Sequence, residues 1–385
     1  MKYNLADICE YAKGKVDVAI LDADTYISTE NMMPNKRGIT SATSLPTVAQ
    51  TQAFLAGDIL VSNIRPYFKK IWFAEFNGGC SNDVLVFRVK NGVSKRFLYY
   101  VLANDTFFDY SMSTSKGTKM PRGDKAAIMK YDVPDFTYEK QEKIAGILDA
   151  LDKKIQLNTE INNNLEQQAM AIFNNAIQQS KSVTYVKLGS LADVKGGKRL
   201  PKGANLMSIP NSHPYIRVRD LNDVVFASLS TNYEYVDDET QKAISRYITT
   251  TDDVLISIVG TIGLTAIVDK SLNMANLTEN CVKVTNLHGI SPEYLLLYLR
   301  SQHGSEEIKK GTVGAVQAKL PIKNIQALSV PLLPQSDLQS LNDTLKILFN
   351  QLSINIAESK CLTDIRDLLL PKLMSGKLDV SDLDL

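Results

Sequence analysis

The sequence lacks the features that would mark a membrane protein, a secreted protein or a zinc protein. No apolar run approaches the roughly 18 residues needed to span a bilayer, and residues 1–11 contain no basic segment followed by an apolar one. The cysteines are far apart, with no CxxC pair and no nearby histidine. We therefore expect a cytoplasmic protein that does not bind membranes and has buried free thiols at Cys9, Cys80, Cys281 and Cys361.

Motifs of catalysis are also missing. The chain has no Gly-rich dinucleotide loop, no GxxxxGK[ST] phosphate loop and no Pro-Pro pair of the kind found in amino-methyltransferase sites. The three histidines are scattered, so none is expected to act as a general base. Neighbouring carboxylates beside strands and turns are expected to be ordinary solvated acids rather than metal ligands: Asp237, Asp238, Asp252 and Asp253. The sequence predicts no enzyme activity, no metal and no cofactor in this chain.

Bulk charge gives no sign of a nucleic-acid binder, because 43 Lys and Arg residues face 42 Asp and Glu residues, a net charge of +1. Any such function must rest on local basic patches offset by acidic surface elsewhere. A hydrophobic content of 44% with 22% charged residues is typical of a globular protein. A chain of 385 residues is expected to form two cored domains of roughly 150 to 200 residues.

An internal duplication organises the chain. Landmarks of the first half recur in the second half, in the same order, at offsets of 194 to 197 residues. The pairs are residues 57–62 with 252–257, 97–102 with 294–299, 116–118 with 310–312, and Val133-Pro134 with Val330-Pro331. A near-constant offset over four landmarks predicts two copies of one module.

Each copy has the pattern of a compact α+β module. Short β-branched and aromatic runs, such as residues 84–87 and 215–218, alternate with Gly- and Asn-rich turns and predict strands. Each copy ends in a proline-containing stretch that should stay extended, because residues before proline avoid helical geometry. The predicted fold is α+β, with two tandem α/β domains separated by two long antiparallel coiled-coil helices, in an internal pseudo-two-fold arrangement.

A long helix is predicted after each module. Apolar residues of the first helix recur in steps of three and four, as in a coiled-coil seam: Ile144, Leu148, Leu151, Ile155, Leu165, Ala169 and Ile172. The second helix is predicted to start at a capping box of Ser336 and Gln339, and Pro371 should end or kink it. Its stripe is Leu338, Leu341, Leu345, Leu348, Leu352, Leu362 and Leu369.

The middle of both stripes is polar. Asn158 and Asn162 of the first helix correspond to Asn355 and Ser359 of the second, at an offset of 197. In an antiparallel pair these layers could meet and fix the register, or they could face solvent. Helices of this length span roughly 50 to 60 Å. Two modules held by such a pair could read successive major grooves, which repeat every ~34 Å.

Basic turns in both copies are candidates for DNA contact, because cations bind phosphates while forked or amide side chains read base edges. Any one of them could be a solvated turn, but they recur at corresponding places. The first copy contributes Arg65, Tyr67, Lys69, Lys116, Thr118, Lys119 and Arg122. The second contributes Lys195, Lys198, Arg199, Lys202, Arg217, Arg219, Thr261, Lys310, Thr312, Gln317 and Lys319, with Arg217 and Arg219 expected on a strand.

Several stretches, taken in order, resemble the specificity subunit of bacterial Type I restriction-modification enzymes over nearly the whole length. Residues 187–203 and 214–221 are similar to the opening of a target-recognition domain, residues 259–263 and 277–280 to its middle, and residues 330–335 to its exit. Residues 138–145 resemble the start of the spacer helix, and residues 369–378 the closing segment. The first domain matches less well, because Arg65-Pro66-Tyr67 stands where the second has Gly260-Thr261.

The resemblance implies a division into two target-recognition domains, 1–137 and 181–334, a central spacer helix at 138–180, and a C-terminal spacer helix and tail at 335–385. Each domain would read half of a split, asymmetric sequence in double-stranded DNA, and the helices would bind two methyltransferase subunits. Those partners would hold S-adenosylmethionine, and a motor-nuclease subunit would use ATP and Mg²⁺. The alternatives are a coiled-coil protein scaffold without DNA specificity and a fused enzyme with an unrecognised active site.

Overall fold

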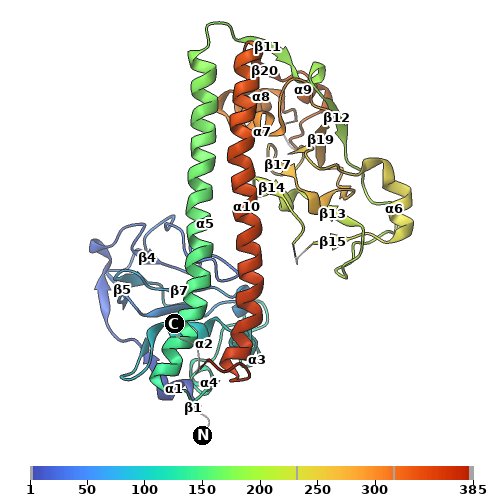
Figure 1. Cartoon of the computed structure of the whole chain (residues 1–385). Helices are drawn as coiled ribbons and strands as arrows, with labels where there is room; N and C mark the ends of the chain where they lie inside the picture. Colours follow the sequence, from blue (N-terminus) through green and yellow to red (C-terminus); the bar gives the residue numbers. More distant parts are fainter. Residues whose placement is uncertain (1–2, 231–232, 315–316, 381–385) are drawn as a thin grey trace. The chain divides into compact units, whose positions relative to one another are not determined.

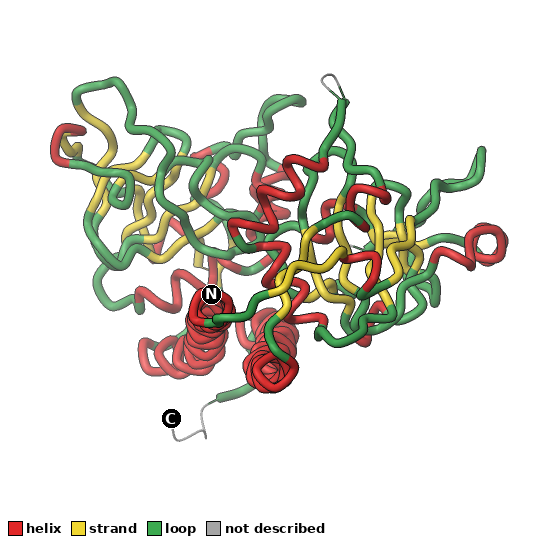
Figure 2. The backbone as a smooth tube through the Cα atoms, turned by 90° about the horizontal axis from the view of Figure 1, so that it is seen from above, coloured by secondary structure: helices red, strands yellow, loops and turns green. Residues whose placement is uncertain are grey.

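The computed structural model describes residues 3–230, 233–314 and 317–380 and divides the chain into two compact units (Figure 1). Unit 1 is Met1–Leu157 with Glu358–Leu385, and unit 2 is Asn158–Ala357. Two long helices, α5 (Tyr138–Gln179) and α10 (Gln335–Met374), each contribute residues to both units. Figures 1 and 2 show these helices side by side. No helix of the described ranges is long and apolar enough to cross a membrane.

In the part of unit 1 that the structure describes, the strands form two four-stranded sheets and a short strand pair. The first sheet is antiparallel, with the order β2 (Cys9–Tyr11), β9 (Val84–Val89), β6 (Ile59–Ser62) and β7 (Ile71–Phe73). The second has the order β3 (Lys15–Asp17), β5 (Gln50–Phe54), β8 (Gly78–Cys80) and β4 (Tyr26–Ile27), in which β4 pairs parallel with β8. Strand β1 (Tyr3–Asn4) pairs with β10 (Asp132–Val133).

The described residues of unit 1 also form four shorter helices: α1 (Leu5–Ile8), α2 (Lys95–Ala103), α3 (Asp105–Ser113) and α4 (Lys125–Ile128). The Ser94 hydroxyl accepts a hydrogen bond from the Phe97 N–H and starts α2, as expected for a serine N-cap. Buried side chains of α2 pack with Ile144 and Leu148 of α5 and with Leu373 of α10. The core of unit 1 therefore includes both long helices.

Unit 2 repeats this plan. Its main sheet has the order β12 (Asp193–Gly196), β19 (Cys281–Thr285), β16 (Val254–Ser257), β17 (Thr265–Val268) and β14 (Phe226–Ala227). The second has the order β15 (Glu234–Tyr235), β13 (Pro214–Ile216) and β18 (Asn276–Leu277), and again contains a parallel pair, β13 with β18. Strand β11 (Thr184–Lys187) pairs with β20 (Ser329–Leu332), and the helices are α6 (Asp238–Ile244), α7 (Pro292–Arg300), α8 (Gln302–Gly311) and α9 (Ile322–Gln326).

Buried ion pairs confirm the duplication at the level of single residues. Asp58 of unit 1 pairs with Arg88, and Asp253 of unit 2 pairs with Lys283 at 2.9 Å, so that acid and cation are both offset by 195 residues. The expectation that Asp253 is solvated was wrong, because its side chain is 3% exposed. It follows a turn but lies at the head of buried strand β16, where Lys283 of β19 reaches it.

The predicted helical stripes are confirmed except at one position. Ile172 is 37% exposed, whereas the next residue, Phe173, is 2% exposed and packs its ring 5.0 Å from that of Tyr294. A step of four residues from buried Ala169 reaches Phe173, and a helix of 3.6 residues per turn keeps that position closer to the seam than a step of three. The large aromatic ring then fills the interface with α7.

The start of α10 differs from the prediction. The helix begins at Gln335, so Ser336 lies inside the first turn and its hydroxyl donates to Asp337 at 3.1 Å. Pro334 stands at the entry, and its carbonyl accepts the Leu338 N–H at 2.9 Å. At the other end, α10 continues past Pro371 to Met374.

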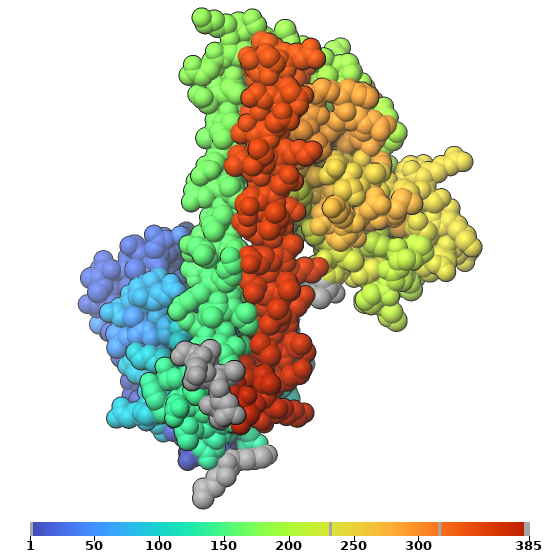
Figure 3. All heavy atoms as spheres, viewed as in Figure 1, coloured from blue at the N-terminus to red at the C-terminus, as the bar shows by residue number. Residues whose placement is uncertain are grey.

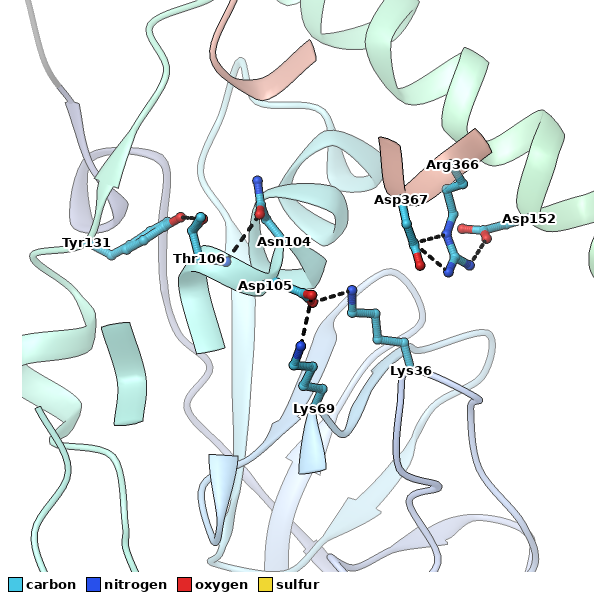
Figure 4. Close-up of polar contacts among 9 residues, drawn as sticks. All are labelled: Lys36, Lys69, Asn104, Asp105, Thr106, Tyr131, Asp152, Arg366 and Asp367. Carbon is cyan, nitrogen blue, oxygen red and sulfur yellow. Dashed lines mark hydrogen bonds and ion pairs between the residues drawn. The ribbon is translucent and has the colours of Figure 1, made fainter. Parts of the chain in front are cut away.

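The polar layer of unit 2 faces inward, which decides between the two alternatives left by the sequence. Asn158 is 1% exposed and Asn355 is 5% exposed. The Asn355 side-chain amide donates to the Asn162 carbonyl oxygen at 2.9 Å. In unit 1 the contacts run antiparallel, since Arg366 Nη1 lies 2.7 Å from Asp152 and Lys154 Nζ lies 3.3 Å from Glu358. Figure 4 shows the Asp152–Arg366 contact.

Candidate nucleic-acid interface

Two of the predicted basic loops of unit 1 lie against each other. The Arg65 N–H donates to the Pro121 carbonyl at 2.8 Å, and Arg122 forms isolated β-bridges with both Ile64 and Lys116. Loop 64–70, which follows β6, and loop 114–123, which follows α3, therefore form one surface. The fold brings together Arg65, Tyr67, Lys69, Lys116, Thr118, Lys119 and Arg122 on these two loops.

Unit 2 has the corresponding pair of loops. Lys319 bridges both Val259 and Val313, and the Leu320 N–H donates to the Ile258 carbonyl at 3.0 Å. This surface carries the predicted residues Thr261, Gln317 and Lys319, all exposed. The same two loops, after the same strand and the same helix pair, thus meet in each unit.

The bridges correct one landmark of the predicted repeat. Gly117 corresponds to Gly314, at an offset of 197, and both adopt left-handed backbone with φ of +91° and +97°. The earlier pairing of Gly117 with Gly311 was wrong, because Gly311 ends helix α8. Lys310 therefore lies on a helix rather than in a turn, 3.5 Å from Glu307. The Thr312 hydroxyl donates to the Ile308 carbonyl at 2.8 Å.

Most cations of the unit 1 surface already have acidic partners. Lys69 pairs at 2.8 Å with Asp105, which Lys36 also contacts at 2.8 Å (Figure 4). Burial raises the pKa of Asp105, but the hydrogen bonds from both lysines outweigh this effect and hold that pKa below its ordinary value. Both lysines are therefore tied to α3, the helix that begins at Asp105.

The second loop of this surface is also internally paired. Lys116 lies 2.6 Å from Asp124, and Arg122 lies 3.0 Å from Asp83. The hydrogen bond from Lys116, with others from the Ala127 and Ala126 backbone, lowers the pKa of Asp124 to about 2. By contrast, Lys119 is exposed and no ion pair of it is found among the described residues. A ligand that binds Lys116 or Arg122 must compete with these carboxylates.

Three predicted arginines of unit 2 line one cavity of about 400 Å³. Arg199 pairs with Glu279 at 2.7 Å, and Arg217 and Arg219 share the Glu234 carboxylate. The other lining residues are Leu200, Leu206, Tyr215, Val218, Thr278, Glu279 and Asn280. This arrangement presents guanidinium groups beside the Tyr215 ring and the Asn280 amide, a set suited to base edges or phosphates.

The expectation that Arg217 and Arg219 lie on a strand was wrong. Strand β13 ends at Ile216, Arg217 caps a 3₁₀ helix, η4 (Val218–Leu221), and Arg219 lies within it. The cause is local, because the Asp220 carboxylate accepts the Arg217 N–H at 2.8 Å and turns the chain. The turn places both guanidinium groups within reach of Glu234.

The basic Gly-rich turn of unit 2 packs tightly on β18. A Cβ at Gly197 would lie 2.0 Å from the Thr278 carbonyl oxygen, so this position requires glycine. Lys198 Nζ lies 5.4 Å from the ring centroid of Tyr247, and Lys195 pairs with Asp193 at 3.1 Å. Lys202 is exposed, beyond the packed part of the turn, and no ion pair of it is found in the described part of the chain.

Sequence reasoning missed the acids of this interface, because their positions in the chain give no hint of it. Glu279 lies 80 residues from Arg199, and Asp83 lies 39 residues from Arg122. It also missed that Cys361 is exposed on α10, whereas the other three cysteines are buried as expected. No cluster of three or more potential metal-ligating His, Cys, Asp or Glu side chains occurs among the described residues.

Comparison with known proteins agrees with this architecture. The family model for the Type I restriction modification DNA specificity domain matches twice, at residues 1–167 and 180–361. The HindI specificity subunit of Haemophilus influenzae is 23% identical over an alignment of 463 positions, covering 98% of this chain and 99% of that protein. The MjaIX specificity subunit of Methanocaldococcus jannaschii is 23% identical over 317 residues, covering 76% and 71% of the two chains.

A solved structure shows the same fold. The Type I restriction-modification S subunit from M. genitalium covers 99% of this chain and 96% of its own, with a TM-score of 0.59 at 16% identity. The two matches to the family model leave little of the chain outside them. The chain belongs to the family of DNA specificity subunits of Type I restriction-modification systems, the non-catalytic part of such complexes.

Proposed function

We propose that this chain directs a methyltransferase to a split, asymmetric DNA sequence, with one half-site read by each target-recognition domain, 1–137 and 181–334. The observation that carries the proposal is the loop pair that occurs in both units with different side chains. Arg65-Pro66-Tyr67 stands on the first loop of unit 1 where unit 2 has Gly260-Thr261-Ile262. Because the same scaffold presents different groups, the two half-sites differ in sequence.

Charge on these loops supports contact with the DNA backbone. Lys119, Lys202 and Lys319 are exposed and reach phosphates directly, whereas the paired cations exchange a carboxylate for a phosphate on binding. The arginines at the 400 Å³ cavity offer planar forks for base edges, and Arg217 is the first candidate for base contact. This division predicts two classes of variant, one affecting affinity and one affecting sequence preference.

The spacer segments, 138–180 and 335–385, dock two methyltransferase subunits in this proposal. Large apolar side chains remain exposed on α10, with Ile347 at 69%, Ile354 at 60% and Leu368 at 58%. Figure 3 shows one face of α10, in red, at the surface. Exposed apolar groups that recur on one helix favour a protein partner. The partners supply S-adenosylmethionine and adenine methylation, and a motor-nuclease subunit uses ATP and Mg²⁺, all within the cytoplasm.

Mapping of methylated adenines across the host genome, with and without this gene, tests the proposal. We expect methylation at a two-part motif to disappear on deletion and to return with the wild-type gene. An unchanged methylome, with the methyltransferase demonstrably active, would favour the coiled-coil scaffold instead. A steep fall of DNA affinity with salt in the assembled complex would count against the scaffold, because phosphate contacts release counterions.

A further inference from the structure

Two neighbouring aromatic rings are exposed on the basic surface of unit 1. Tyr67 is 48% exposed and Phe68 is 38% exposed, and their ring centroids lie 4.7 Å apart. Met120, on the adjoining loop 114–123, is 47% exposed. Removing such side chains from water is favourable, yet here they are exposed on a turn between charged residues. A ligand that fits this surface has both apolar faces and negative charge.

The turn that carries the rings is held rigidly. It is a 3₁₀ helix, η2 (Pro66–Phe68), flanked by Arg65 and Lys69, both in left-handed backbone with φ of +50° and +51°. Non-glycine residues in that region cost free energy that surrounding contacts must offset. Those contacts are the Phe68 and Lys69 carbonyls, which accept the N–H groups of Asn35 and Lys36 at 2.8 and 2.9 Å.

Side-chain contacts add to this clamp. The Asp105 carboxylate pairs with both Lys36 and Lys69 (Figure 4). These lysines belong to the two segments, 35–36 and 68–69, that the backbone hydrogen bonds already connect. Pro66 is buried and limits the backbone further. The backbone that carries the rings is therefore held in one conformation before any ligand arrives, so little further ordering of this turn is needed on binding.

The charges around the rings identify the partner. Lys70 and Lys119 lie on the same two loops, and the described residues show no ion pair for either. Lys69 and Arg122 would exchange the Asp105 and Asp83 carboxylates for phosphates on binding. Apolar faces flanked by phosphates are the chemistry of stacked bases in duplex DNA. A protein partner of that kind would need a hydrophobic patch bordered by carboxylates, which is an outcome the test below distinguishes.

We propose that Tyr67 and Phe68 form a wedge that inserts at one base step of the half-site read by unit 1 and unstacks it. The inference rests on the proposed function. Unit 2 has Gly260-Thr261-Ile262 on the corresponding loop, without an aromatic side chain, so the distortion is confined to one half-site. The energy needed to open a base step depends on its sequence. A wedge therefore adds a preference for an easily deformed step to the recognised sequence.

The test uses the full chain assembled with its methyltransferase partner and duplexes that carry 2-aminopurine at successive positions of both half-sites. The target adenines and their neighbours are left out, because the methyltransferase unstacks them when it flips the target base. We expect enhanced fluorescence, which reports unstacking, at one step of one half-site only. Tyr67→Ala combined with Phe68→Ala should abolish the enhancement and weaken binding about tenfold to a hundredfold. Tyr67→Phe should retain both properties, and Tyr185→Ala, which removes a ring of similar exposure from β11, should change neither.

Three results would overturn the wedge. They are a wild-type complex that binds its target without any enhancement, a double variant that keeps the enhancement, and a double variant that loses the methyltransferase rather than DNA affinity. Single Tyr67→Ala and Phe68→Ala variants repeat the measurement if the double variant does not fold. Failure of the wild-type complex to select any split target would instead refute the proposed function.

Discussion

Arg88 donates two parallel hydrogen bonds to the Asp58 carboxylate, from Nε to Oδ1 at 2.8 Å and from Nη2 to Oδ2 at 2.6 Å. The same carboxylate accepts the Leu55 N–H at 2.8 Å, which fixes the turn that enters β6. Asp253 does the same for β16 by accepting the Thr250 N–H at 2.7 Å. A buried acid in each unit thus joins the turn before a central strand to a cation on the neighbouring strand.

Loss of the Asp58 carboxylate should strongly destabilise unit 1. We expect Asp58→Ala to lower the free energy of unfolding by about 3–5 kcal/mol, because it leaves the Arg88 charge without its partner. Trp72, the single tryptophan, is buried on β7 beside β6, so its fluorescence during urea unfolding reports this unit. Lys153→Ala removes an exposed lysine from its pair with Asp149, which keeps Arg96 as a partner, and should cost below about 1 kcal/mol. Equal effects of the two variants would refute this assignment.

The inward-facing asparagines should limit stability while defining helix pairing. We expect Asn158→Leu combined with Asn355→Leu to raise the free energy of unfolding by about 1–3 kcal/mol, since two buried polar groups become apolar. The same variant should lose a unique association state, because a polar layer fixes register. Urea titration followed by circular dichroism and light scattering after size exclusion measure the two effects. A less stable, homogeneous variant would contradict the prediction.

Only one of the four cysteines should react in the folded protein. Burial raises the pKa of the Cys9, Cys80 and Cys281 thiols to about 12, whereas Cys361 is exposed on α10. Because the thiolate is the nucleophile, a disulfide reagent at pH 8 should modify one thiol per native chain and none in Cys361→Ser. Rapid modification of a second thiol would show that a unit opens readily. Slower labelling of Cys361 in the methyltransferase complex would support docking on α10.

The exposed and paired cations of unit 2 should affect DNA binding differently. We expect Lys202→Ala to weaken binding to all sequences alike and to reduce the salt slope by about 1. Arg217→Ala should cost about 1–3 kcal/mol at one base pair and relax the preference there. Affinity measurements on a set of single-base variants of the target, at several salt concentrations, separate the two. Unchanged affinity and preference after combined loss of Lys198, Arg199 and Lys202 would refute the loop assignment.

The duplication and the two helices could be predicted because each produces a regular spacing of residues in the sequence. Steps of three and four residues marked the buried faces of α5 and α10. The offset between the copies was visible in strands such as residues 57–62 and 252–257. It failed at Gly311, because residues 310–312 repeat the letters of residues 116–118 three positions before the true counterpart. The helix starts Asp105 and Gln302 and the bridged residues Arg122 and Lys319 share an offset of 197, which pairs Gly117 with Gly314.

The candidate site could be predicted only as a set of loops. Their cations were visible, but the side chains that hold them come from distant segments, as when Glu234 receives both Arg217 and Arg219. Local hydrogen bonding also overrode residue type, since Asp220 turns the chain where the β-branched and aromatic run at residues 215–218 predicted a strand. Such contacts depend on tertiary packing, which a single sequence does not encode in any short window.

Under the proposed function, the acidic partners of the loop cations influence how a near-neutral protein searches a genome. Each carboxylate pairs with its cation in the free protein, as Asp124 does with Lys116 and Glu279 with Arg199. A phosphate of any DNA sequence must displace that carboxylate to bind the cation. Under the proposed function, this internal competition shortens the dwell time on wrong sequences. Only a site that also satisfies the base-reading groups compensates for breaking the pairs, so the carboxylates sharpen discrimination without touching a base.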